Sequence, residues 1–183
     1  LEFRRVLFRS TGVTGVWVIP GIGNTTVFAA KGTNLYSWGY NGYGQTSVQN
    51  AGNVVVSPTL VNAAFSQFMN ENTCDPANMN YQQSIIKCTD NRLYGCGYNG
   101  HCELGIGYAQ DYNDGWTQIL LPSDFNPVVV GSVCSTGTTR VYMAIGSDNR
   151  AYGWGYNGQY GVIQNFIANN IDVPFQINLP FAG

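Results

Sequence analysis

A repeat of 58 residues is the feature that most constrains how this chain can fold. The pattern apolar-Tyr-x-x-Gly-Tyr-Asn-Gly occurs at residues 35–42, 93–100 and 151–158, so each copy begins 58 residues after the previous one. The same register relates residues outside the pattern, among them Val61, Ile119 and Ile177. Chance matches do not keep one register across most of a repeat, so we interpret the chain as three tandem copies of one structural unit.

Each unit is expected to contain a β-hairpin. A short β-prone segment at 25–30, 84–88 or 141–145 is followed by a turn and then by the strand that carries the repeated pattern. The turn dipeptides Asp90-Asn91 and Asp148-Asn149 tolerate positive φ and predict two-residue hairpin loops. Residues 60–70 form the single helix-like stretch, which is short and uncapped, so we expect strand or loop there.

Units of this length built from several short strands are typical of propeller blades, which stack around a central channel. We therefore predict an all-β fold, a partial β-propeller of about three four-stranded antiparallel blades, at about residues 11–64, 65–122 and 123–180. Residues 1–10 are basic and unlike the rest of the chain. We expect them to be an adaptor-like, non-native segment.

Composition argues against several classes of partner. Charged residues make up 10% of the chain, against about 25% in typical domains. Beyond residue 10 the Lys and Arg side chains are scattered, whereas phosphate-backbone binding needs clustered cations, so we expect no nucleic acid. No apolar run is long enough to span a membrane. The cysteine count of five is odd, which favours reduced thiols and a cytoplasmic or nuclear location.

The repeat resembles that of the regulator of chromosome condensation family, whose signature runs Trp-Gly-x-Asn-x-x-Gly-Gln-Leu-Gly. Residues 38–45 follow it until Thr46 replaces the leucine, and Cys96 replaces the tryptophan in the second copy. The family usually places a histidine at the start of the first hairpin strand. The three residues in that slot here are Thr25, Gln83 and Val141.

The resemblance implies a seven-bladed propeller, so we expect further blades of the same protein to complete the ring. A light-sensing branch of the fold carries a Gly-Trp-Arg-His-Thr motif, which this sequence lacks. The residues expected to hold the repeat structure together are Tyr36, Trp38, Gly39, Asn41, Gly42, Tyr94, Cys96, Gly97, Asn99, Gly100, Tyr152, Trp154, Gly155, Asn157 and Gly158.

No catalytic, cofactor-binding or metal-binding residue is predicted. His101 is the single histidine, and its neighbour Cys102 points away from it on an extended segment. Cys96 and Cys102 with one histidine fall short of a four-ligand zinc set. The acidic segment 108–115 lacks the loop pattern of a calcium site, and we interpret it as a polar loop.

The sequence therefore predicts a protein–protein interaction scaffold rather than an enzyme. The resemblance implies guanine-nucleotide exchange on a small GTPase, or a recognition module linked to a ubiquitin ligase. The alternative is an extracellular propeller that acts as an adhesin or as an inhibitor of another protein. We expect the partner to bind loops at one propeller face, with residues 65–81 and 106–115 as the best candidates.

Overall fold

The computed structural model describes residues 12–19, 24–61, 64–69, 83–134, 140–158 and 169–178. Within these ranges the chain forms three antiparallel four-stranded sheets and no helix, which confirms the predicted fold class. The first sheet holds β1 (Gly15–Ile19), β2 (Thr26–Lys31), β3 (Asn34–Tyr40) and β4 (Val54–Val61). The second holds β5 (Phe65–Phe68), β6 (Gln83–Cys88), β7 (Leu93–Gly97) and β8 (Thr117–Gln118). The third holds β9 (Pro127–Cys134), β10 (Arg140–Gly146), β11 (Ala151–Gly155) and β12 (Ile171–Ile177). Within the described residues there is no helix long and apolar enough to cross a membrane.

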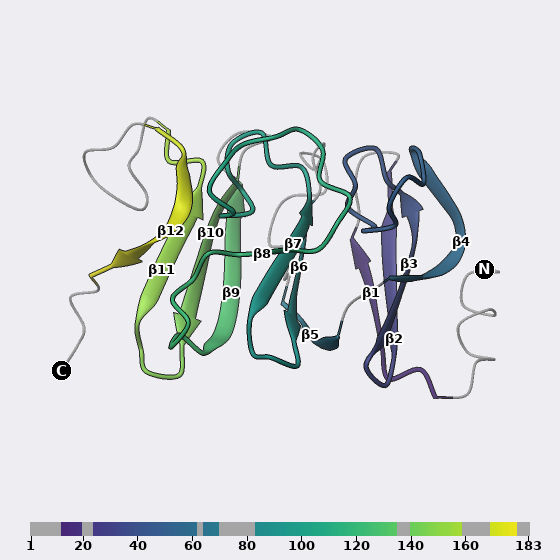
Figure 1. Cartoon of the computed structure of the whole chain (residues 1–183), viewed down its shortest axis with the longest axis horizontal. Coiled ribbons are helices and arrows are strands. Elements are labelled where there is room, and N and C mark those ends of the chain that lie inside the picture. Colours follow the sequence, from purple (N-terminus) through teal and green to yellow (C-terminus); the bar gives the residue numbers. More distant parts are fainter. Residues whose placement is uncertain are drawn as a thin grey trace.

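The three sheets stand side by side in chain order, each facing the next (Figure 1). Strand order within each sheet follows the sequence, so every sheet is a meander of neighbouring strands. The hairpins β2–β3, β6–β7 and β10–β11 all turn at one end of the sheets, which we call the hairpin face. The segments that follow β3, β7 and β11 lie at the opposite end, which we call the turn face (Figure 1).

The hairpins form as predicted, but two of their loops are longer than expected. Asn91 and Asn149 adopt φ values of 64° and 63°, as the turn dipeptides predicted. The amide of Asn91 donates to the carbonyl of Cys88, and the amide of Cys88 donates to the carbonyl of Arg92, so the loop contains three residues rather than two. The third residue of each loop, Asn91 or Asn149, adopts the left-handed conformation and closes the turn.

Residues 65–68 are a strand and not the loop that the sequence predicted. Phe65 and Phe68 are buried and pair with Cys88 and Ile86 of β6, with a register shift between Phe65 and Gln67. The shift breaks the alternation of apolar and polar residues, so the pattern did not reveal a strand. Residues 70–82, the remainder of that predicted loop, lie outside the described residues.

Two hydrophobic cores join the sheets. The first core lies between sheets one and two and includes Phe28, Leu35 and Ile86. The second lies between sheets two and three and includes Ile85 and Trp154. Ile85 and Ile86 are adjacent, so opposite faces of β6 supply the two cores. The middle sheet is therefore covered on both sides, as a propeller blade is.

Candidate interaction surface

The turn that follows each pattern strand depends on a glycine. Gly39, Gly97 and Gly155 have φ values of 101°, 105° and 97°, a region that L side chains rarely adopt. A Cβ atom on Gly39 would stand 2.2 Å from the carbonyl oxygen of Thr25, and one on Gly155 would stand 2.5 Å from that of Arg140. These glycines let the chain leave the strand and cross the start of its neighbour.

A buried asparagine follows each of these glycines, and in the first two repeats it holds the turn closed. Asn41, Asn99 and Asn157 are at most 1% exposed. The Nδ2 group of Asn99 donates to the carbonyl of Tyr108 at 2.6 Å, and its Oδ1 atom accepts from the amide of Leu104 at 2.8 Å. Asn41 makes the corresponding pair of contacts with Gly52 and Thr46. One side chain thus links both arms of the loop at the turn face.

In the first two repeats, the next part of the turn connects one sheet to the following sheet. The indole Nε1 of Trp154 in sheet three donates to the carbonyl of Glu103 in sheet two at 2.9 Å. Gln45 precedes Glu103 by one repeat, and its carbonyl accepts from the hydroxyl of Ser84 at 3.0 Å and from the thiol of Cys96 at 3.4 Å. Cys96 therefore directs its side chain to the same carbonyl slot as Trp154, and it is fully buried.

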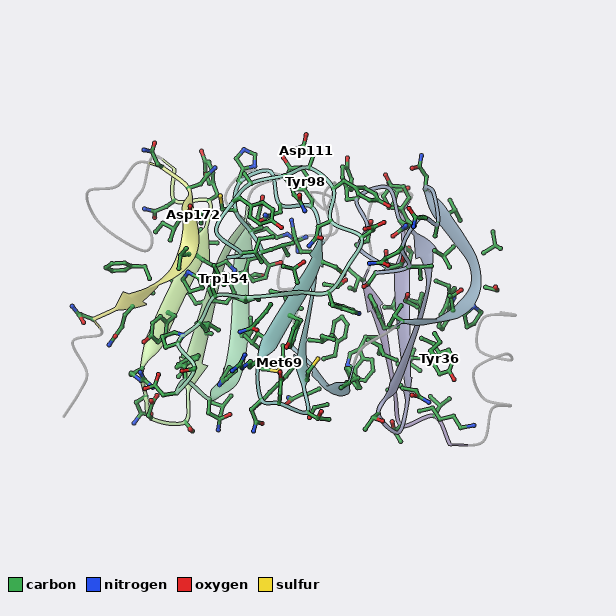
Figure 2. The ribbon with its side chains drawn as sticks, in the orientation of Figure 1. Tyr36, Met69, Tyr98, Asp111, Trp154 and Asp172 are labelled. Atoms are coloured by element: carbon green, nitrogen blue, oxygen red, sulfur yellow. The ribbon has the colours of Figure 1, made fainter. Side chains whose placement is uncertain are left out.

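The tyrosines of the pattern strands lie away from these turns. Tyr152 is 5% exposed and its hydroxyl contacts Gln176, while Tyr94 is half-buried and donates to Asp90. Tyr36 is also half-buried and lies well below the turn face (Figure 2). Trp38 belongs to a third cluster of buried residues, which is built from sheet one alone.

Five aromatic rings form a continuous row along the turn face, which we call the ring row. Its members in spatial order are Tyr40, Tyr43, Tyr98, His101 and Tyr156. Successive ring centroids lie 6.2, 5.5, 6.1 and 5.4 Å apart, all within the range of favourable aromatic pairs. The Tyr43–Tyr98 contact crosses from sheet one to sheet two, and the His101–Tyr156 contact crosses from sheet two to sheet three.

The repeat register generates this row. Tyr40, Tyr98 and Tyr156 share one slot of the repeat, and Tyr43 and His101 share another. Each tyrosine of the first slot folds back over the glycine two positions later: a Cβ on Gly100 would stand 2.1 Å from the hydroxyl of Tyr98. The glycines at 42, 100 and 158 thus leave room for the rings of the row.

The predicted binding loop at 106–115 lies beside the ring row. The amide of Asn113 donates to the carbonyl of Tyr43 at 3.2 Å, and the Oδ2 atom of Asp114 accepts from the amide of Asn50 at 3.1 Å. The loop therefore leans from sheet two onto the turn of sheet one. Asp111 stands at the top of the loop near Tyr98 (Figure 2).

Glu103 is an ionisable group buried beneath the row. Burial raises the pKa of its carboxyl to about 7, against the lowering effects of the amide of His101 and the charge of Arg140. Its Oε2 atom accepts from the amide of His101 at 2.8 Å, and its Oε1 atom lies 3.5 Å from Nδ1 of the same residue. Oε1 has no hydrogen-bond partner in the described part of the chain.

Among the cysteine side chains that the structure describes, none is a reactive thiol beside His101. Burial raises the pKa of Cys102 to about 11, raises that of Cys88 to about 11, and raises that of Cys96 well above its ordinary value. A protonated thiol is a weak nucleophile and a weak metal ligand. Across the described ranges, no three His, Cys, Asp or Glu side chains come together as a metal site.

Sequence reasoning missed the ring row and the inter-sheet contacts of Gln45 and Glu103. The 58-residue register aligned the tyrosines of the row, but it did not predict that rings from neighbouring repeats would be in contact. Gln83, which stands in the family's histidine slot, is fully buried and accepts from the hydroxyl of Tyr142 at 3.2 Å.

No protein-family model matches the sequence. The ultraviolet-B receptor UVR8 of Arabidopsis thaliana is 27% identical over 174 residues, which cover 92% of this chain and 35% of the receptor. Yeast RCC1 (Prp20), in a crystal structure with Kap60, superposes with a TM-score of 0.66 and 22% identity, over 94% of this chain and 38% of that chain. Human WBSCR16 superposes with a TM-score of 0.62 and 18% identity, over 92% of this chain and 41% of that chain.

The chain thus spans between a third and a half of the length of the proteins that it matches. The strict 58-residue register, the three meandering sheets and the turn built on a Gly and an Asn agree with these matches. The chain therefore folds as a partial β-propeller, similar in sequence and fold to proteins with repeats of the regulator of chromosome condensation type.

Proposed function

We propose that this chain is a protein-interaction scaffold and that its turn face binds the partner. The ring row carries the proposal, because it offers aromatic surface across all three sheets at one end of the molecule. Tyr40, Tyr43, His101 and Tyr156 are each half-buried, so they are held by packing and still reach the solvent. Rigid tyrosines supply contact area at low entropic cost, which is why aromatic residues are enriched at interfaces.

Known propellers of this type support the proposal. A yeast relative is described in complex with Kap60, and a second structure of the same protein is described with its binding properties toward Gsp1p and histones. Within this proposal the finer functions are nucleotide exchange on a small GTPase by surface contact, or recognition beside a ubiquitin-ligase domain. Neither requires covalent chemistry from this chain, and we propose that it is not an enzyme.

Selection of random peptides displayed on phage against the immobilised chain tests this proposal. Peptides that bind should lose about tenfold or more in affinity toward a Tyr43→Ala, Tyr156→Ala variant, because truncated interface tyrosines are frequent hot spots. A Tyr36→Ala, Tyr94→Ala variant is the matched control, since it removes two half-buried tyrosines away from the turn face. Equal losses in the two variants, or unchanged binding to the first, would contradict the proposal.

A further inference from the structure

We propose that the turn face recognises a basic segment of its protein partner, one that carries arginine or lysine side chains. This inference rests on the proposed function and adds the chemistry of the partner to it. The exposed cations of the described residues lie at the hairpin face, whereas acidic groups stand against the ring row at the turn face. Together these features define a surface that is aromatic, acidic and free of exposed cations among the described residues.

The cations of the described residues gather at the hairpin face. Lys31 ends β2, Lys87 lies near the end of β6, and Arg92 and Arg150 belong to hairpin loops. Arg150 is paired there with Asp124 and Asp148. The remaining described cation is Arg140 at the start of β10, which is 1% exposed and therefore cannot reach a partner. At the hairpin face these cations stand beside Asp90, Asp124 and Asp148, which offset much of their charge. At the described turn face, a basic ligand meets no exposed cation.

At the turn face, three aspartates have no exposed cation of the described residues beside them. Asp111 and Asp172 are exposed, and both lie at the upper end of the sheets (Figure 2). Asp114 lies in the same loop as Asp111 and is held by the amide of Asn50. The field at this face therefore attracts positive charge.

Asp111 and Tyr98 come together over one point of this surface. The Oδ1 atom of Asp111 and the hydroxyl of Tyr98 lie 2.8 and 2.1 Å from the position that a Cβ on Gly100 would occupy. A carboxylate next to an aromatic hydroxyl offers hydrogen-bond acceptors for a guanidinium or ammonium group. The adjacent rings of Tyr43 and His101 extend this site along the row.

Aromatic rings and carboxylates attract a cation for separate physical reasons, so their effects add. A cation within about 6 Å of a tyrosine ring is attracted by the negative face of the ring. A carboxylate at an exposed site attracts the same cation through its charge. Arginine fits this combination better than lysine, because its planar guanidinium stacks on rings while it binds a carboxylate.

Binding of labelled model peptides to the full chain tests the inference. A fluorescein-labelled peptide of five Arg-Ala units should bind, whereas one of five Glu-Ala units should not, as measured by fluorescence anisotropy. Asp111→Asn should weaken binding of the arginine peptide about fivefold, and the added Tyr43→Leu change should weaken it further. Asp124→Asn is the matched control, because it removes the same charge from an exposed site at the hairpin face and should leave binding unchanged.

The outcomes separate this inference from the proposed function. If Asp111→Asn and Asp124→Asn weaken binding equally, the peptide senses net charge and the inference is wrong. It is also wrong if the arginine peptide does not bind while phage-selected peptides still depend on Tyr43 and Tyr156; in that case the proposed function stands. Phage-selected peptides whose affinity does not depend on Tyr43 and Tyr156 would contradict both the inference and the proposed function. Circular dichroism of each variant verifies the fold, and Tyr156→Leu replaces Tyr43→Leu if the latter unfolds.

Discussion

A single repeat slot shows how one residue can either stabilise a turn or make its stability depend on pH. Gln45 and Glu103 are both fully buried, and each accepts a hydrogen bond from the amide two residues earlier. Gln45 is neutral at every pH, whereas Glu103 can ionise in a site that disfavours its charge. The groups that face Glu103 are the imidazole of His101, the guanidinium of Arg140 and the carboxylate of Asp111.

Replacing Glu103 with glutamine should remove a loss of stability that occurs as the pH rises. An acid with a raised pKa holds its proton more tightly in the folded chain than in the unfolded one. The wild-type chain should therefore lose stability from its ordinary pKa of 4.5 up to about 7, and the loss should persist at higher pH. The upper bound on this loss is about 3 kcal/mol. Urea unfolding at pH 5 and pH 8 measures it.

The opposite substitution supplies the control for this prediction. Gln45→Glu places a carboxyl in the equivalent buried slot of sheet one, so a new loss of stability should appear as the pH rises. Titratable groups shared by all three proteins cancel when the pH dependences are compared. A Glu103→Gln variant with the same pH dependence as the wild-type chain would show that Glu103 ionises freely in the folded state.

At the scale of elements, the loops at the turn face depend on a few buried side chains. Asn99→Ala should destabilise the chain by about 2–4 kcal/mol, because the buried amide of Leu104 and the carbonyl of Tyr108 lose their partner. Asn113→Ala is the matched control in the same loop, since its side chain makes long contacts with the hydroxyl of Thr117, at 3.3 and 3.5 Å. We expect a change below about 1 kcal/mol there. Urea unfolding tests both, and equal losses would contradict the role given to Asn99.

The same elements show what sequence can and cannot reveal. The 58-residue repeat predicted the hairpins, because the turn dipeptides and the strand segments recur at the same positions of the repeat. It missed β5, since the register shift after Phe65 hides the alternation of buried residues. It also missed the ring row, because a contact such as Tyr43 with Tyr98 joins different repeats. Local patterns report the structure within a unit, whereas the candidate surface arises where units meet.

At the scale of the whole molecule, the stability of each sheet should depend on the sheets packed directly against it. The core between sheets one and two shares no residue with the core between sheets two and three, although both draw on β6. Stacked repeats behave as units coupled to their nearest neighbours. The two cores therefore predict that a weakened junction affects the sheets on either side of it more than the sheet beyond.

Trp154→Phe and Phe28→Leu test this coupling as a pair. Trp154→Phe removes the donor to the carbonyl of Glu103 and part of a buried ring, at a cost of about 2–4 kcal/mol. Amide hydrogen exchange should then accelerate in β10–β11 and β6–β7 while β2–β3 stays near its wild-type rates. Phe28→Leu at the other junction should accelerate exchange in β2–β3 and β6–β7 and spare β10–β11. Uniform acceleration in all three sheets would mean that the molecule unfolds as one cooperative unit, and acceleration confined to the mutated sheet would mean that the cores do not couple neighbours.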